Sequence, residues 1–198
     1  MNVKAEFEHL IKVLMLGDTA VGKTNFIFRF VEGRFSDTYI STIGFDCKAT
    51  IVTLPNTKKS VKIQVWDTAG QERYMSLNKN LFLRVQGIVL LYDVTRVETY
   101  NHVELWLKSI KEMNENIPIV LVGNKVDLEE NKVVTTQQGQ DLSKKYKIDF
   151  FEASAKDGTN VKEAYCRLAE KVLTNVKQEE GGFFSLDKDK NPQKSGCC

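Results

Sequence analysis

A glycine-containing segment near the N-terminus carries the residue types that bind phosphate. In GDTAVGKT, the residues Gly17, Gly22, Lys23 and Thr24 match the spacing G-x-x-x-x-G-K-[ST]. Glycines lack a Cβ, so the loop can turn successive backbone N–H groups toward an anion. Lys23 adds a positive charge for the β- and γ-phosphates, and the Thr24 hydroxyl is a hard oxygen ligand for Mg²⁺. The segment predicts a magnesium-polyphosphate site; a turn without a ligand is the alternative.

The segments on either side of this loop predict how it is positioned. Residues 10–16, LIKVLML, form an apolar run of the length of a buried strand, and residues 23–30, KTNFIFRF, begin a helical pattern. The positive end of that helix dipole would face the same phosphate as the loop amides. Strand, loop and helix together predict one anion site.

Length and composition limit the classes of protein to consider. The 198 residues are 42% hydrophobic, which is enough for one domain with a full core. Because 28 Lys and Arg stand against 26 Asp and Glu, the net charge is only +2, and we expect no nucleic-acid partner. We find no signal-peptide run and no segment that approaches a transmembrane span, so we expect a protein made and kept in the cytosol. The layout of Cys47, Cys166, Cys197 and Cys198 suggests no disulfide framework.

Strand-like runs alternate with helical patterns along the chain. Residues 45–54 and 61–66 predict an antiparallel hairpin, whereas the β-branched runs at 87–94 and 117–125 predict strands buried on both faces of a parallel sheet. Residues 148–155 predict a further strand. We therefore expect the α/β class, with a doubly wound, mostly parallel six-stranded sheet, one antiparallel edge hairpin and helices on both faces.

The expected helices have recognisable ends or apolar faces. A weak helix would end at Leu83, and two later helices would start at capping pairs and end near Tyr146 and Val176. The capping pairs are Thr135 with Gln138, and Asn160 with Glu163. The helix between the two buried strands carries Val103, Leu105, Trp106, Leu107 and Ile110, and the last helix would turn Ala164, Leu168 and Val172 inward.

Ligands of doubly wound sheets bind at the carboxyl ends of the strands, where this chain has five polar motifs. In chain order they are GDTAVGKT, STIG, WDTAGQE, NKVD and ASAK. Over residues 12–176 this set resembles the Ras superfamily of small GTPases, and WDTAGQERY with the terminal cysteines is most similar to its Rab family. The resemblance implies a P-loop NTPase G domain that binds GTP or GDP with Mg²⁺.

One carboxylate predicts the choice of base. Asp127 of NKVD can only accept hydrogen bonds, and guanine offers an N1–H beside an amino group, whereas adenine has an acceptor at N1. Asp127 should therefore favour GTP over ATP. The expected difference is on the order of several kcal/mol, the cost of leaving a buried acceptor without a hydrogen-bond donor. The alternative is a surface turn in which Asp127 caps a helix.

The resemblance extends the nucleotide site to further residues. It implies that Asn124 faces the guanine N7, that the Lys125 stem lies against the base, and that the Ala155 N–H points toward O6. Phe35 would stack on the base, although a core position fits its sequence equally well. The remaining nucleotide contacts would be Thr19, Ala20, Val21, Asn25, Tyr39, Leu128, Ser154 and Lys156.

Four residues are assigned to the γ-phosphate, the metal and the attacking water. Asp67 would hold Mg²⁺ through water, and Thr42 would ligate Mg²⁺ and sense the γ-phosphate. Gly70 leaves room for the γ-phosphate beside its N–H, and Gln71 matches the glutamine that orients water. A solvated loop residue is the alternative for Gln71, and an ordinary strand residue is the alternative for Thr42.

The resemblance also implies a cycle of partners. Loss of the γ-phosphate should release the loops that carry Thr42 and Gly70. We expect an exchange factor, effectors, and a GTPase-activating protein that supplies an arginine, because no arginine is evident for this role in cis. The effector surface would comprise Ile43, Phe45, Cys47, Trp66 and Leu81. Cys47 and Leu81 depart from the family's usual aromatic residues. The effectors known for other family members can therefore not be assigned to this chain.

The C-terminus predicts a membrane anchor. We divide the chain into a G domain at residues 1–178 and a flexible tail at 179–198. Cys197 and Cys198 resemble the paired geranylgeranylated cysteines of the Rab family, although two unmodified thiols are the alternative. Two lipid chains hold a protein stably on a membrane, whereas one chain gives only weak, reversible binding. The resemblance implies a prenylation escort, a GDP-dissociation inhibitor and a location on the cytoplasmic face of an intracellular membrane, cycling with the cytosol.

Two other functions fit parts of the sequence. A scaffold could bind guanine nucleotides with little turnover, although Gln71 and Thr42 argue against it. A P-loop kinase or transferase would need a second substrate pocket and would tolerate adenine.

Overall fold

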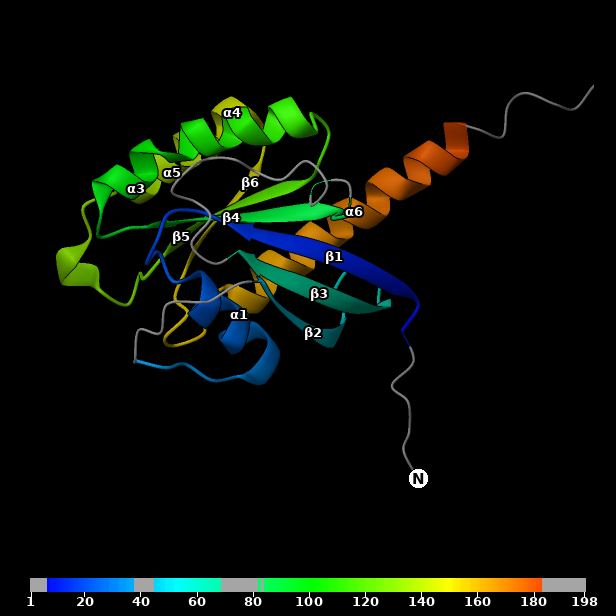
Figure 1. The fold of residues 1–198 in the computed structure, drawn as a ribbon, viewed down its shortest axis with the longest axis horizontal. Helices are drawn as coiled ribbons and strands as arrows, with labels where there is room; N and C mark the ends of the chain where they lie inside the picture. The colour runs from blue at the N-terminus through cyan, green and yellow to red at the C-terminus, as the bar shows by residue number, and fades with distance from the viewer. Residues whose placement is uncertain (1–6, 38–44, 69–81, 83, 183–198) are drawn as a thin grey trace, which may run out of the picture.

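A six-stranded sheet forms the centre of the molecule. The computed structural model describes residues 7–37, 45–68, 82 and 84–182. Its strands lie in the order β2-β3-β1-β4-β5-β6 (Figure 1). They are β1 His9–Leu16, β2 Phe45–Thr53, β3 Ser60–Thr68, β4 Gly87–Asp93, β5 Ile119–Asn124 and β6 Asp149–Ala153.

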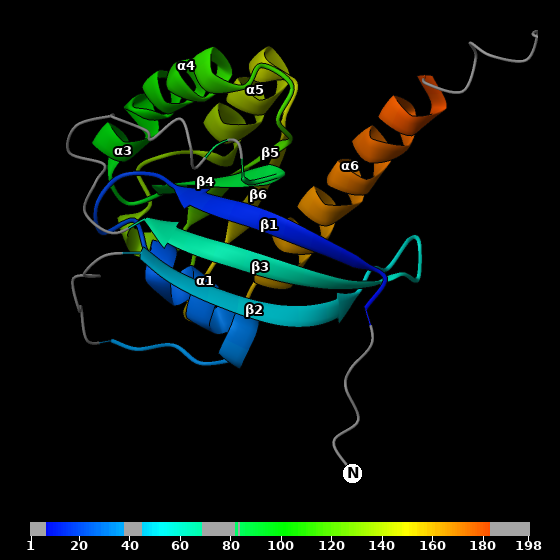
Figure 2. The same cartoon turned by 45° about the vertical axis from the view of Figure 1, so that its right-hand side comes forward.

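The pairing of the strands confirms the predicted class of sheet. β2 and β3 form an antiparallel hairpin at one edge, and every other pair is parallel (Figure 2). All residues of β4 and β5 are buried, as expected for strands covered on both faces. The carboxyl ends of the parallel strands therefore meet at one edge of the domain.

Helices cover both faces of the sheet (Figures 1 and 2). One core cluster joins Phe26 of α1 and Leu168 of α6 to β1 and β3, and the other joins Trp106 of α4 and Leu142 of α5 to β4. The elements are α1 Lys23–Glu32, α3 Val97–Asn101, α4 Val103–Met113, α5 Thr136–Tyr146, α6 Val161–Gly182 and the 3₁₀ turn η2 Glu129–Asn131. The doubly wound α/β prediction is confirmed.

The ends of α5 show how local sequence sets an element. The Thr135 Oγ1 accepts from the Gln138 backbone N–H at 3.2 Å, and the Gln138 Oε1 accepts from the Thr135 N–H at 2.8 Å. This is the predicted capping box, and it satisfies two N–H groups that the helix start would leave open.

Some details of the helices differ from the predictions. Residues 97–113 form α3 and α4, which meet at His102, instead of one helix. Leu105 is 47% exposed, whereas the other four apolar residues named for this segment are buried in α4. The last helix continues to Gly182 instead of ending near Val176, because residues 177–180, Lys-Gln-Glu-Glu, are all good helix formers. Asn160 adopts φ +55° just before α6, and its Nδ2 donates to the Glu152 carbonyl at 2.7 Å. The predicted helix end at Leu83 lies outside the described residues.

None of the described helices combines the length and apolar character that crossing a membrane requires.

Candidate functional site

The loop between β1 and α1 depends on its two glycines. Gly17 has φ +133°, and a Cβ there would lie 2.1 Å from the Leu91 carbonyl oxygen. Gly22 has φ +101°, and its Cβ would lie 2.5 Å from the Asn124 Nδ2. Residues with side chains rarely adopt either conformation and would also collide with neighbours. The spacing of the two glycines in the sequence is thus required by the path of the backbone.

The carbonyl groups of this loop are held by side chains from around it. Lys23 Nζ donates to the carbonyl oxygens of Gly17 at 2.7 Å and Asp18 at 2.9 Å. The next three carbonyls accept from three other residues. The pairs are Arg96 to Thr19 at 2.9 Å, Lys125 Nζ to Ala20 at 3.0 Å and Asn124 Nδ2 to Val21 at 2.8 Å.

This arrangement fixes the direction of the loop N–H groups. No peptide in the described chain is cis, and the C=O and N–H of a trans peptide point to opposite sides. Holding the carbonyls of Thr19, Ala20 and Val21 therefore turns the following N–H groups away from those side chains. In the part of the chain that the structure describes, the N–H groups of Ala20, Val21 and Gly22 have no acceptor. Such a set of N–H groups fits an anion.

Charge at the start of α1 favours the same ligand. Lys23, the first residue of α1, is buried at 7% exposure, and the first turn contains no acidic residue. The helix has 10 residues, so its N-terminal N–H groups carry the positive end of a substantial dipole. Lysine, helix end and loop amides together fit a polyphosphate.

Two hard oxygen groups meet beside the loop. Thr24 Oγ1 donates to Asp67 Oδ2 at 2.7 Å, and Asp67 is buried at 3% exposure at the end of β3. Within the described ranges, no group of three or more His, Cys, Asp and Glu side chains could hold a metal by itself. A hydroxyl beside a carboxylate fits Mg²⁺, which usually takes one or two protein ligands and completes its shell with water and phosphate oxygens.

The ends of β5 and β6 bring the predicted base-binding residues together. Asp127 Oδ1 accepts from Ser154 Oγ at 2.6 Å, and the buried Ser154 Oγ also accepts from the Lys156 N–H at 3.1 Å. The Ala155 N–H donates to Asn124 Oδ1 at 3.1 Å instead of projecting freely toward a ligand. Its contact with guanine O6 remains a prediction.

Two residues of the site, Asp93 and Arg96, were not identified from the sequence. Asp93 ends β4 with 1% exposure, and its Oδ2 lies 2.6 Å from Lys125 Nζ and 3.2 Å from Arg96 Nε. Burial by itself would raise the pKa of Asp93, but hydrogen bonds from Lys125 and Thr95 and the Lys125 charge lower it below the usual value. Asp93 thus orients both cations that hold the Thr19 and Ala20 carbonyls. Its place at the carboxyl end of a buried strand was the available signal.

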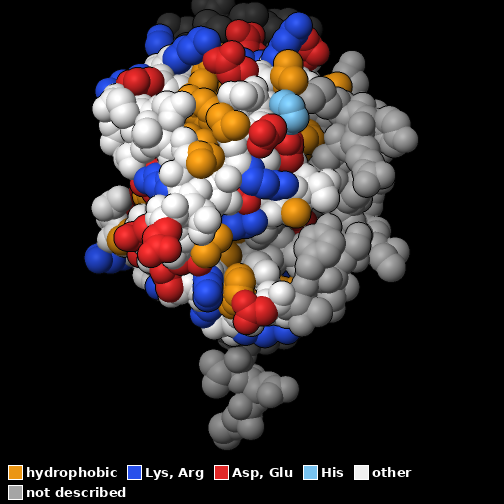
Figure 3. All heavy atoms as spheres, turned by 90° about the vertical axis from the view of Figure 1, so that its left-hand side faces the viewer, with side chains coloured by type: hydrophobic (Ala, Val, Ile, Leu, Met, Phe, Trp, Pro, Cys, Tyr) orange, Lys and Arg blue, Asp and Glu red, His pale blue; other side chains and the backbone are white. Residues whose placement is uncertain are grey.

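A further contact ties the loop to α4. The Asp18 carboxylate accepts from Trp106 Nε1 at 2.9 Å and lies 2.6 Å from His102 Nδ1. The donors stand one turn apart, so they hold the acidic side chain against the helix. Figure 3 views the molecule from the side of these loops, where basic and acidic side chains gather near the middle of the face.

Several predicted residues have other contacts or lie outside the described ranges. Asn25 Nδ2 donates to the Ser36 carbonyl at 2.9 Å, and half-buried Phe35 packs against the core cluster of α1 and α6. Their nucleotide contacts remain predictions, as does that of Leu128, which is 38% exposed. Outside the described residues lie Tyr39, Thr42, Ile43, Gly70, Gln71, Leu81, Cys197 and Cys198.

The described part of the predicted effector surface lies on the hairpin. Cys47 of β2 is opposite Trp66 of β3, and Gln64 Nε2 donates to Cys47 Sγ at 3.0 Å. Cys47 and Cys166 are free thiols, as expected. Phe45 begins β2.

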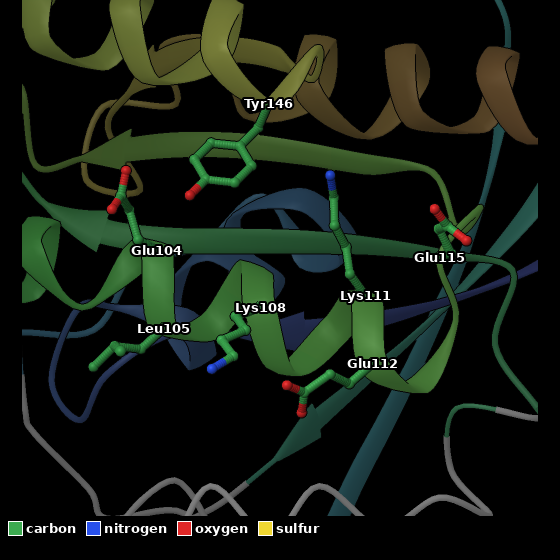
Figure 4. Close-up of a pocket in the computed structure, with 7 residues that line it drawn as sticks. All are labelled: Glu104, Leu105, Lys108, Lys111, Glu112, Glu115 and Tyr146. Carbon is green, nitrogen blue, oxygen red and sulfur yellow. The ribbon is translucent and has the colours of Figure 1, made fainter.

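A separate hollow lies on the outer side of α4 (Figure 4). Its lining consists of Glu104, Leu105, Lys108, Lys111, Glu112, Glu115 and Tyr146. None of these residues belongs to the predicted nucleotide site.

Known proteins share this combination of fold and loops. The family model described as Ras family matches residues 12–174. The chain is 40% identical over 184 residues to Ras-related protein Rab-3B of Homo sapiens, which covers 92% of this chain and 80% of that protein. It is 38% identical over 173 residues to Ras-related protein Rab-3C of Bos taurus, covering 87% of this chain and 75% of that protein. This chain therefore belongs to the Ras family of small GTPases and is most similar to Rab proteins.

Proposed function

We propose that this protein is a Rab-like molecular switch that binds GTP and GDP, hydrolyses GTP slowly and regulates intracellular membrane traffic. The observation that carries the proposal is the loop from Gly17 to Gly22. Its carbonyls are held by Lys23 and by residues from two other strand ends, which leaves its N–H groups for phosphate.

The base site supports guanine as the ligand. Ser154 donates its only hydroxyl proton to Asp127 Oδ1, which holds the carboxylate at the ends of β5 and β6. The other oxygen of Asp127 and its remaining lone pairs suit the adjacent donors of guanine. Adenine would place an acceptor against this carboxylate, so we propose strong selection of GTP and GDP over ATP and ADP.

Mg²⁺ fits the pair of oxygen groups at the start of α1 and the end of β3. Thr24 would be a direct ligand and Asp67 would act through water, with Thr42 completing the set in the GTP state. When bound, the ion neutralises charge on the β- and γ-phosphates. Lys23 adds a fixed positive charge beside the same phosphates.

The hydrolytic step would rest on positioning. We assign Gln71 to orient the attacking water, with Gly70 leaving room for the γ-phosphate. The only arginine that the described structure places on the phosphate loop, Arg96, is bonded to the Thr19 carbonyl and Asp93. We therefore propose a slow intrinsic rate and acceleration by an activating protein that supplies an arginine.

The switch would act through Thr42 and Gly70, whose loops are held only while the γ-phosphate is present. Effectors would read this state on the surface that includes Ile43, Phe45, Cys47, Trp66 and Leu81. An exchange factor would reload GTP. Lipids on Cys197 and Cys198, added with a prenylation escort, would anchor the protein on the cytoplasmic face of a membrane, and a GDP-dissociation inhibitor would extract it.

A single-turnover experiment tests this function against a scaffold that binds without turnover. We expect GTP-loaded protein to release phosphate slowly, and a Gln71→Leu variant to release it more slowly still. Phosphate release no faster than in buffer, even with an active stimulating protein present, would favour the scaffold. Equal rates for wild type and Gln71→Leu would remove the role of Gln71.

Membrane attachment is tested separately. Prenylated protein should bind vesicles, whereas a variant with Cys197 and Cys198 replaced by Ser should stay in solution after the same treatment. Unchanged binding by the double variant would rule out the lipid anchor.

A further inference from the structure

Arg96 occupies an unusual position between a buried carboxylate and the phosphate-binding loop. One end of its guanidinium, Nε, lies 3.2 Å from Asp93 Oδ2, and a terminal nitrogen donates to the Thr19 carbonyl at 2.9 Å. The side chain is 41% exposed, whereas Asp93 is 1% exposed. The partly exposed Arg96 is therefore held by the carboxylate of the buried Asp93.

The chemistry of the guanidinium suits this bridge. Arginine presents five donors in a rigid plane, so its Nε can bond to Asp93 while a terminal nitrogen bonds to the Thr19 carbonyl. Asp93 is also held by Lys125 Nζ, which shares Oδ2 with Arg96, and by Thr95, which donates to Oδ1. The position of the Arg96 terminal nitrogen is thus set by contacts at the end of β4.

The carbonyl that Arg96 holds belongs to the same peptide as the Ala20 N–H. Because that peptide is trans, fixing the Thr19 C=O toward Arg96 points the Ala20 N–H to the opposite side of the loop. Ala20 itself has φ +63°, a conformation that is uncommon for a residue with a side chain. The loop therefore needs an external contact to keep this peptide in place.

We propose that Arg96 is a positioning residue for phosphate binding: anchored by Asp93, it holds the Thr19 carbonyl so that the Ala20 N–H faces the nucleotide phosphates. This inference rests on the proposed nucleotide-binding function. It assigns to Arg96 a role on the phosphate side of the site, whereas Lys125, which shares Asp93 and holds the Ala20 carbonyl, would also contact the base.

The test compares release of GDP and IDP from purified, magnesium-loaded protein. IDP lacks the amino group that Asp127 would bind, so the ratio of the two release rates reports contacts with the base. Arg96→Met removes the donors and keeps a long apolar stem. We expect it to release both nucleotides about three- to tenfold faster, the effect of about one hydrogen bond, with an unchanged GDP-to-IDP ratio. Arg96→Lys should restore part of the retention because a donor remains.

Arg167→Met is the matched control. Arg167 is 47% exposed and its Nε lies 3.0 Å from Asp149 Oδ2, so it makes a similar ion pair away from the loop. It should release GDP at the wild-type rate. Equal rates for wild type and Arg96→Met would overturn the proposal, as would faster release with a reduced GDP-to-IDP discrimination, which would place the effect on the base. Failure of wild type to bind either nucleotide would instead overturn the proposed function.

Discussion

Thr24 Oγ1 and Asp67 Oδ2, from the start of α1 and the end of β3, are joined by a hydrogen bond of 2.7 Å. Two elements far apart in the sequence thus present hard oxygens at one point beside the phosphate loop. We interpret this pair as the protein's part of the magnesium site.

Removing the Thr24 hydroxyl should make the rate of GDP release nearly independent of Mg²⁺. Thr24→Val keeps the shape of the side chain but leaves no ligand oxygen. We expect GDP release to accelerate about 10- to 100-fold, as for loss of an interaction with a charged group, and to respond little to EDTA. Fluorescent GDP release with and without EDTA measures both effects. Thr136→Val, which removes a hydroxyl bonded to Glu152 Oε2 at 2.8 Å, should keep the full EDTA response. An equal EDTA response in Thr24→Val would exclude Thr24 as a ligand.

Asp127 should determine the base. In Asp127→Asn the side chain gains two N–H donors, so it can pair with the C2 oxygen that xanthine carries in place of the guanine amino group. We expect weaker GDP binding and stronger XDP binding, together reversing the preference by at least about a hundredfold. Competition between labelled GDP and unlabelled XDP measures the preference. Asp157→Asn, in the neighbouring loop and bonded to the Thr159 N–H at 2.7 Å, should retain guanine preference. Should Asp127→Asn keep GDP as its best ligand, the base assignment is wrong.

Two of the positive-φ glycines, Gly17 and Gly33, should respond differently to alanine. Gly17→Ala would place a Cβ 2.1 Å from the Leu91 carbonyl oxygen of a buried strand, whereas nothing lies within 4 Å of the position at Gly33. We expect Gly17→Ala to cost about 3 kcal/mol or more of unfolding free energy, and Gly33→Ala only about 1–2 kcal/mol for its left-handed backbone. Urea unfolding without nucleotide avoids a contribution from altered binding. Equal losses would show that β1 and β4 can move apart to accept the side chain.

Asp93 should make stability depend on acid pH. Its pKa is lowered on folding, so the ionised carboxylate stabilises the protein at neutral pH, and this contribution is lost as pH falls from the unfolded value near 3.8 through the lower folded value. We expect Asp93→Asn to lose about 2 kcal/mol or more at pH 7 and the difference from wild type to shrink below about pH 4. Urea unfolding across pH 3–7 at several points gives the profile. A difference that stays constant with pH would contradict the assigned ion pairs.

Asp149 is the control for Asp93. Burial favours a higher pKa for Asp149, but Arg167 and Lys171 lower it below the usual value, so Asp149→Asn should show the same sign of pH dependence. Because Asp149 lies at the start of β6, away from the loop, Asp149→Asn should leave GDP release unchanged, whereas Asp93→Asn should accelerate it.

The sequence predicted the sheet and the main loop because those features depend on local pattern. The buried runs of β4 and β5 and the glycine spacing at Gly17 and Gly22 act through residues close in the chain. The strand end at Asp93 was visible in the sequence, but the contact of Arg96 with the Thr19 carbonyl was not, because it depends on the end of β4 lying beside the loop that follows β1. Leu105 is exposed because the buried residues of α4 recur at helical spacing, at positions 103, 106, 107 and 110, and position 105 lies off that face.

Competition between guanine and adenine nucleotides tests the account most directly. Purified protein stripped of its nucleotide and supplied with Mg²⁺ should bind fluorescent GDP, and GTP should displace it at similar concentrations. ADP and ATP should fail to displace it even at about a hundredfold excess, because Asp127 would face an acceptor. Displacement by ATP as readily as by GTP, or no GDP binding by folded protein, would contradict the account.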